Sequence, residues 1–193
     1  MSPAATMDDA TARAAVLQSA NEVFYARGIA GVGMADIRDE SGVSLRRLYT
    51  LYPSKRELVA AWLTDRHSTW MEWFTGSVDQ RRASGVEPLL AAFDAIAEWA
   101  GSSGYRGCAF VNSAAETAEI DDTHRRIIAA HKEDLLTYLT SLAADGGFSQ
   151  PERLGRMVGV LLDGAMVEAA VLSSCEPIDA AREAAALLIE ASQ

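Results

Sequence analysis

The segment SGVSLRRLYTLYPSKREL, Ser41–Leu58, decides how this chain of 193 residues is interpreted. The whole chain is acidic, with 17 Lys and Arg against 27 Asp and Glu and a formal net charge of −10. Between Gly42 and Arg56, however, it carries four cations, two tyrosines and no carboxylate. The first 56 residues hold seven basic and six acidic side chains, and the remainder holds ten and 21. This uneven charge predicts that any polyanion binds the N-terminal part.

Residues that start and stop helices divide the same segment into short helices. Gly42 ends one helix, and Ser44 is a favourable N-cap for the next, over 45–51. Pro53 ends that second helix, and Ser54 caps a long helix that follows. Two short helices joined by Ser-Gly-Val-Ser form a helix-turn-helix, whose second helix lies in the major groove of DNA.

This second helix carries groups that suit DNA. The planar guanidinium groups of Arg46 and Arg47 fit guanine edges or phosphates, and the phenols of Tyr49 and Tyr52 can donate to phosphates. A phosphate at the N-terminus of the next helix would suit Lys55 and the free N–H groups there. The residues predicted to contact double-stranded DNA are Ser44, Leu45, Arg46, Arg47, Tyr49, Thr50, Tyr52 and Lys55.

From about residue 13 to 58 the chain resembles the DNA-binding domain of TetR-type (tetracycline-repressor-like) bacterial regulators. The matching positions are Val16-Leu17, Ala20, Phe24, Gly28, Met34, Asp36-Ile37, Gly42-Val43-Ser44, Leu48-Tyr49, Tyr52-Pro53-Ser54-Lys55 and Glu57-Leu58. The order and spacing of so many elements favour DNA binding over a solvated basic surface. The chain departs from the family pattern at Arg46-Arg47, where Gly-Thr is frequent.

The resemblance implies a homodimer with two recognition helices in successive major grooves of a palindromic operator. It also implies repression that is relieved when a small-molecule effector binds the second domain. Ala, Leu, Glu and Arg dominate the rest of the chain, and strand-like alternation is missing. We therefore expect an all-α protein, with a three-helix bundle over 1–53 that contains the helix-turn-helix. A six-helix domain for ligand binding and dimerisation would span 54–193.

Helical segments are predicted over 8–27, 34–41, 45–51, 55–78 or beyond, 87–100, 109–118, 122–144, 151–173 and 177–191. All four tryptophans lie in the fourth and fifth of these. Aromatic residues at helical spacing are typical of a core, but pockets between helices are also mostly apolar. The residues predicted to bind the small molecule are Trp62, Trp70, Trp73, Phe93, Trp99, Phe110, Asn112, Glu116, His131 and Asp163.

The predicted helix over 151–173 is apolar nearly all round and contains several glycines. Such a helix is buried, either in the core of its own chain or against a partner. Together with the last helix it could form a four-helix interface across a two-fold axis. The residues predicted for the dimer interface are Gly155, Val158, Gly159, Leu162, Met166, Ala169, Leu187 and Leu188.

The sequence contains no recognisable pattern for catalysis, a metal or a cofactor. The three histidines are scattered, and neither a phosphate loop nor a nucleophile elbow is present. No apolar run is long enough for a membrane span, so we expect no membrane partner and a cytoplasmic location. Two alternatives stay open. One is an all-helical carrier or enzyme that retains the fold, and the other is a redox-sensing regulator that uses Cys108, close to Arg106.

Overall fold

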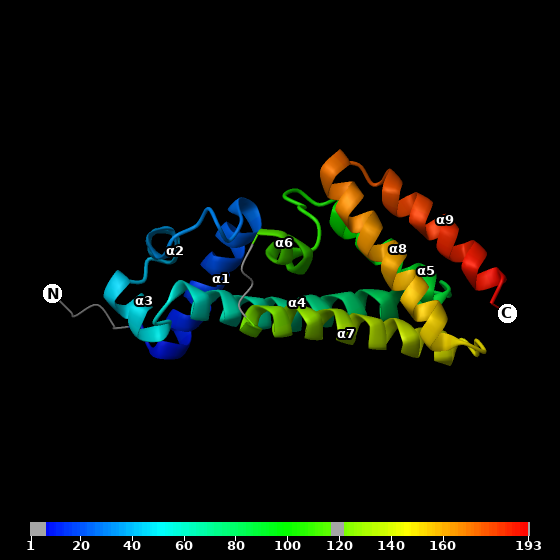
Figure 1. Ribbon diagram of the computed structural model, residues 1–193, viewed down its shortest axis with the longest axis horizontal. Helices are drawn as coiled ribbons and strands as arrows, with labels where there is room; N and C mark the ends of the chain where they lie inside the picture. Colours follow the sequence, from blue (N-terminus) through cyan, green and yellow to red (C-terminus); the bar gives the residue numbers. More distant parts are fainter. Residues whose placement is uncertain (1–6, 117–121, 193) are drawn as a thin grey trace. The chain divides into compact units, whose positions relative to one another are not determined.

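In a computed structural model, which describes residues 7–116 and 122–192, the chain forms α-helices and no strand (Figure 1). The helices are α1 (Asp9–Arg27), α2 (Met34–Ser41), α3 (Leu45–Leu51), α4 (Lys55–Ala83), α5 (Pro88–Ala100), α6 (Ala109–Glu116), α7 (Asp122–Asp145), α8 (Pro151–Leu172) and α9 (Glu176–Glu190). The predicted all-α fold class is therefore confirmed. Helix α4 extends to Ala83, in agreement with the predicted end at residue 78 or beyond, and the predicted end of α6 at residue 118 lies outside the described residues.

The chain divides into two compact units. The first unit comprises Met1–His67 and Asn112–Ile127, and the second comprises Ser68–Val111 and Ile128–Gln193. The first unit extends past the boundary at 53/54 that the sequence suggested, because the start of α4 packs with α1. There, the ring centroids of Phe24 and Trp62 lie 5.2 Å apart.

The first unit is built around the helix-turn-helix formed by α2 and α3. Its helices α1, α2 and α3 pack against one another in every pairing. The side chains of Ile37, Val43 and Leu48 are buried in this unit. Gly42 separates these helices with a left-handed backbone, φ +67°, which an L side chain rarely adopts. A glycine here lets α3 turn away from α2 without strain.

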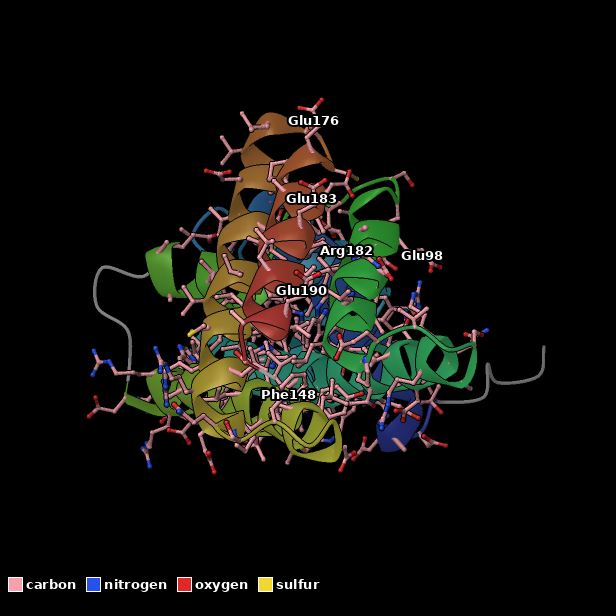
Figure 2. The ribbon with its side chains drawn as sticks, turned by 90° about the vertical axis from the view of Figure 1, so that its right-hand side faces the viewer. Glu98, Phe148, Glu176, Arg182, Glu183 and Glu190 are labelled. Atoms are coloured by element: carbon pink, nitrogen blue, oxygen red, sulfur yellow. The ribbon has the colours of Figure 1, made fainter. Side chains whose placement is uncertain are left out.

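The second unit contains helices α5, α8 and α9, which pack against one another, and the C-terminal parts of α4 and α7. In Figure 2, α9 lies in front of α8 and α5, both of which it contacts, with Arg182 on the side of α9 towards α5. The guanidinium of Arg182 donates to both carboxylate oxygens of Asp94 on α5, at 2.6 and 3.3 Å. This two-point contact fixes the position of α9 against α5.

Candidate nucleic-acid interface

Helix α3 has one buried side and one exposed side. Ser44 caps its N-terminus by accepting a hydrogen bond from the backbone N–H of Arg47. Leu48 and Leu51 are buried one turn apart, so the opposite side of the helix is turned outward. Ser44, Leu45, Arg46, Tyr49 and Thr50 are all exposed, and they form the outer face of α3.

Within this outer face, Arg46 has the most available positive charge. Its side chain is exposed, and its guanidinium makes no ion pair with any of the described residues. One turn further along, Tyr49 is 46% exposed, and the hydroxyl of Thr50 donates to the backbone carbonyl of Arg46. A guanidinium beside a phenol on one exposed helical turn can serve a phosphate or the edge of a base.

Arg47 differs from its neighbour, although the sequence analysis treated the two alike. The Nη2 atom of Arg47 lies 2.9 Å from Oδ1 of Asp9 at the start of α1. Asp8, the N-cap of α1, is also affected: the backbone N–H of Thr11 lowers the pKa of this carboxyl, and the charge of Arg47 adds a smaller effect in the same direction. In the structure, Arg47 is thus directed to the acidic end of α1.

Tyr52 is a correction to the predicted set of DNA contacts. Only 5% of this residue is exposed, so its ring belongs to the core of the first unit. The guanidinium carbon of Arg13 lies 5.3 Å from the ring centroid, and Nη1 of Arg13 donates to the carbonyl of Leu51 at 3.2 Å. The side chain of Tyr52 therefore closes the end of α3 against α1.

Lys55 begins α4, as predicted, and has carboxylates as neighbours. Burial lowers the pKa of its ammonium group, and the charges of Asp36 and Glu116 oppose that shift. The hydrogen bond from the backbone N–H of Gly33 holds the pKa of Asp36 below its usual value, and Arg27, 2.8 Å away, adds to the effect. Lys55 therefore interacts electrostatically with two carboxylates, in addition to any contact with a phosphate.

Glu116 was predicted to bind a small molecule, but its carboxylate is used inside the first unit. Oε2 of Glu116 accepts hydrogen bonds from the backbone N–H groups of Ile29 and Ala30, in the loop between α1 and α2. Gly28 permits this approach, because a Cβ at that position would lie 2.7 Å from Oε2. No local sequence signal reveals a contact between residues more than 80 positions apart.

The other predicted ligand-binding residues are divided between the units. Trp62 and Asn112 belong to the first unit with Glu116, and the remaining seven belong to the second. Trp62 is buried, and its Nε1 donates to Oδ1 of Asn21 on α1 at 3.2 Å. The indole of Trp62 is therefore part of the packing between α1 and α4.

The second unit contains an aromatic cluster formed by Trp70, Trp73, Phe74 and Trp99. The ring centroids of Trp70, Trp73 and Trp99 lie 5.8 to 6.2 Å from one another, and Phe74 stacks on Trp70 at 4.8 Å. Rings at these distances contact each other directly. The rings of the cluster therefore pack against one another as core residues do, although Trp73 remains partly exposed.

The predicted residues Phe93, Phe110 and His131 are buried in the second unit. The imidazole of His131 stacks on Phe110, with centroids 3.6 Å apart, and also lies against Trp70. The structure thus joins His131 and Phe110 to the aromatic cluster.

A groove between α7 and α8 has a volume of about 420 Å³. Its lining residues are Lys132, Glu133, Leu135, Leu136, Arg156, Gly159, Val160 and Asp163. The predicted residue Asp163 forms an ion pair there with Lys132, at 2.5 Å. Nζ of Lys132 also lies 3.7 Å from Sγ of Cys108, which is buried. The groove is therefore more charged than the aromatic cluster.

Most residues predicted for a dimer interface are instead buried within one chain. They are Gly155, Val158, Leu162, Met166 and Ala169, all of α8. Gly155 lies so close to α7 that a Cβ there would be 2.9 Å from the Cα of Thr140. Gly159 faces Leu139 of α7, Leu188 is half-buried, and Leu187 is 67% exposed. The residues of α8 predicted for the interface therefore lie mainly on its inner face.

The outer face of α8 carries a different apolar stripe. Its exposed residues are spaced three or four positions apart, so they lie on one face of the helix. They are Val160, Gly164, Val167 and Val171. We call these four residues the α8 stripe. Val160 and Val171 are 68% and 76% exposed. The spacing was visible in the sequence, but nothing there distinguished this side of an apolar helix from the inner one.

Within residues 7–116 and 122–192, no group of three or more His, Cys, Asp or Glu is placed to hold a metal ion. Of the helices described, none combines the length and apolar character that a membrane crossing requires.

Comparison with known proteins gives consistent matches. The family model for bacterial regulatory proteins of the tetR family matches residues 16–62. The HTH-type transcriptional regulator TtgR of Pseudomonas putida is 39% identical over 57 residues. That alignment covers 30% of this chain and 27% of TtgR, so this chain spans about a quarter of the length of such curated relatives.

Solved structures match over nearly the whole chain. The crystal structure of a TetR-family transcriptional regulator from Streptomyces coelicolor is 28% identical, with a TM-score of 0.81. The match covers 94% of this chain and 95% of that one. The reduced form of Escherichia coli NemR has a TM-score of 0.80 at 20% identity, covering 90% of this chain and 94% of NemR, and so shares the fold.

Proposed function

Because the chain belongs to the tetR family of bacterial regulatory proteins, we propose that it is a transcriptional repressor that binds a palindromic operator as a homodimer. In this proposal, it acts in the cytoplasm, and a small molecule releases it from DNA without any catalytic step. The observation that carries the proposal is the outer face of α3, where Arg46, Tyr49 and Thr50 are exposed together.

The distribution of charge supports DNA as the partner of this face. Arg46 offers a guanidinium that no described carboxylate neutralises, in a protein whose net charge is −10. A strongly acidic protein is repelled by DNA except where cations gather, so contact is restricted to the face that carries them. Phosphate contacts of this kind weaken as salt rises, because bound counterions are no longer released to a dilute solution.

The α8 stripe and Leu187 support the homodimer. Large apolar side chains that are two-thirds exposed or more, such as Val160, Val171 and Leu187, are costly in water when they gather in one patch. A two-fold axis would pair α8 and α9 with the same helices of a second copy. A dimer of this kind positions two α3 helices for half-sites about 34 Å apart, or a multiple of that distance.

For the effector, we propose the second unit, whose aromatic cluster and adjoining His131 supply apolar and polar groups together. The effector must bind the DNA-free conformation more tightly than the DNA-bound one, because only a difference in affinity shifts the equilibrium. Ring contacts as close as those of Trp70 and Phe74 imply that rings must move apart to admit a ligand between them.

The proposal is tested by titrating the protein against DNA from upstream of its own gene, at two salt concentrations. We expect binding that requires both halves of a palindrome and weakens at the higher salt. Binding that is indifferent to the palindrome and to salt would contradict the proposal. An all-helical carrier or enzyme would bind a small molecule in the same way with or without Arg46→Ala, and would have no affinity for DNA.

The redox alternative receives less support. Lys132 supplies a cation close to Cys108, but only 5% of Cys108 is exposed. Redox-sensing thiols are normally accessible to solvent and therefore to the oxidant. The ligand-responsive repressor is accordingly the function that we propose.

A further inference from the structure

Two polar contacts join α1 to α3, and they occur at matching positions. Asp9 of α1 accepts from Arg47 of α3, and one turn later Arg13 of α1 donates to the carbonyl of Leu51 of α3. Both contacts join residues 38 positions apart in sequence. The two helices therefore run side by side here. Helix α1 supplies an acidic side chain, Asp9, to the first contact and a basic side chain, Arg13, to the second.

The acidic contact lies at the surface. The side chain of Asp9 is 79% exposed and that of Arg47 is 24% exposed. Asp8 places a second carboxylate at the same end of α1, and it is held there as the N-cap by a hydrogen bond of 2.7 Å from the backbone N–H of Thr11. Two negative charges consequently lie at the end of α1 that faces the predicted recognition helix.

We propose that Asp9 competes with the DNA backbone for Arg47, and so keeps the affinity for the operator below the level that α3 could otherwise reach. The inference rests on the proposed function, since it concerns the strength of the same contact with DNA. The two arginines of α3 then have separate roles. Arg46 is available to DNA at all times, whereas Arg47 reaches a phosphate only by leaving Asp9.

Exchange of Asp9 for a phosphate is feasible because the ion pair is weak and the alternative is strong. Ion pairs with a carboxylate as exposed as that of Asp9 contribute little to stability. A guanidinium binds phosphate through two parallel hydrogen bonds, with charge on both partners. The position of α3 does not depend on the ion pair, because Leu48 and Leu51 are buried and Arg13 holds the other end.

The carboxylate of Asp9 remains after the exchange. It is attached to the first residue of α1, beside an N-cap that is itself negatively charged, so it stays close to the place where Arg47 meets the phosphate. Like charges repel, and this repulsion subtracts from the gain of the new contact. Asp9 thus opposes DNA binding in two ways, by holding Arg47 and by repelling the phosphate.

The experiment compares wild type, Asp9→Asn, Arg47→Ala and the double variant by fluorescence anisotropy on operator DNA at several salt concentrations. Asp9→Asn is expected to tighten binding about 3- to 5-fold at low salt. It should also steepen the slope of log affinity against log salt by up to about 0.9, the value for one added phosphate contact. The gain should be much smaller in the Arg47→Ala background, because only the direct repulsion between Asp9 and the phosphate then remains to be relieved.

Asp65→Asn is the matched control, since it removes one exposed negative charge from α4 in the same unit. It should change affinity much less than Asp9→Asn does. Circular dichroism melting of each variant establishes that folding is retained. If wild type binds the operator and Asp9→Asn leaves the affinity unchanged or weakens it, this inference alone is overturned. Failure of the wild type to bind any palindromic DNA would overturn the proposed function, and this inference with it.

Discussion

Oε2 of Glu116, the last residue of α6, lies 2.5 Å from the backbone nitrogen of Ile29 in the loop between α1 and α2. The same oxygen accepts a longer hydrogen bond, 3.3 Å, from the backbone N–H of Ala30. This loop leads directly into the helix-turn-helix, so a carboxylate near the middle of the chain fixes the start of the DNA-binding motif.

Replacing Glu116 tests this anchor. Glu116→Ala leaves two backbone N–H groups without their acceptor, which costs about 1–3 kcal/mol where the groups are buried. Glu116→Gln keeps one carbonyl oxygen and should cost less. Hydrogen exchange at the amides of Ile29 and Ala30 should be fastest in the Ala variant and intermediate in the Gln variant. Equal exchange rates in all three proteins would show that the contact does not order the loop.

The outer face of α3 predicts unequal effects of otherwise similar substitutions. Arg46→Ala should weaken operator binding by about 1–3 kcal/mol, because it removes an exposed guanidinium from the face that we assign to DNA. Tyr49→Phe should weaken binding by a smaller amount. Tyr52→Phe is the matched control, since its ring is buried, and it should leave DNA affinity unchanged. A loss of affinity in Tyr52→Phe as large as that in Tyr49→Phe would contradict this assignment.

The α8 stripe predicts the effect of a charge on self-association. Val171→Asp should weaken the dimer by about 2 kcal/mol or more per copy, since the carboxylate would be buried against the partner. Because Val171 is exposed in the single chain, the fold should be retained. Analytical ultracentrifugation at several concentrations measures the change. Met7→Asp introduces the same charge at another exposed apolar residue, and it should leave the dimer intact.

Adding one methyl group at Gly155 should lower the stability of the second unit. A Cβ at this position would lie 2.9 Å from both the backbone N and the Cα of Thr140, so Gly155→Ala must push α7 and α8 apart. Overpacking of this kind costs about 1–3 kcal/mol, which thermal unfolding can measure. Gly76→Ala in α4 is the control: no neighbouring atom lies within 4 Å, and the change should stabilise the helix by about 0.5–1 kcal/mol.

Tyr138 predicts a dependence of stability on alkaline pH. Burial raises the pKa of its phenol to about 12, from the usual value of 10.0, and the charge of Asp79 acts in the same direction. The folded state therefore retains the proton more strongly than the unfolded state does. The associated stability is fully present below pH 10 and is lost as pH rises from about 10 towards about 12.

Tyr138→Phe removes the ionising group and should reduce the decline of melting temperature in that pH window. The difference in ultraviolet absorbance between wild type and variant isolates the ionisation of this one phenol. Ionisation of Tyr138 near pH 10 in the folded protein would contradict the prediction.

The sequence by itself determined the helices and the helix-turn-helix. Caps and breaks at Asp8, Gly42, Ser44 and Pro53 act through atoms within a few residues, so they can be recognised without knowledge of the fold. The same local rules made Leu48 an inward residue and Tyr49 an outward one. The exposed side of α3 followed from its sequence for this reason.

Only the tertiary structure decided how similar residues differ in their surroundings. It directed Arg47 to Asp9 and left Arg46 exposed, and it buried Val158 while leaving Val160 in the α8 stripe. It also placed Glu116 on the backbone of Ile29, far away in sequence. The partners in these contacts are brought together by packing between helices, and no pattern within one helix specifies which neighbour that packing supplies.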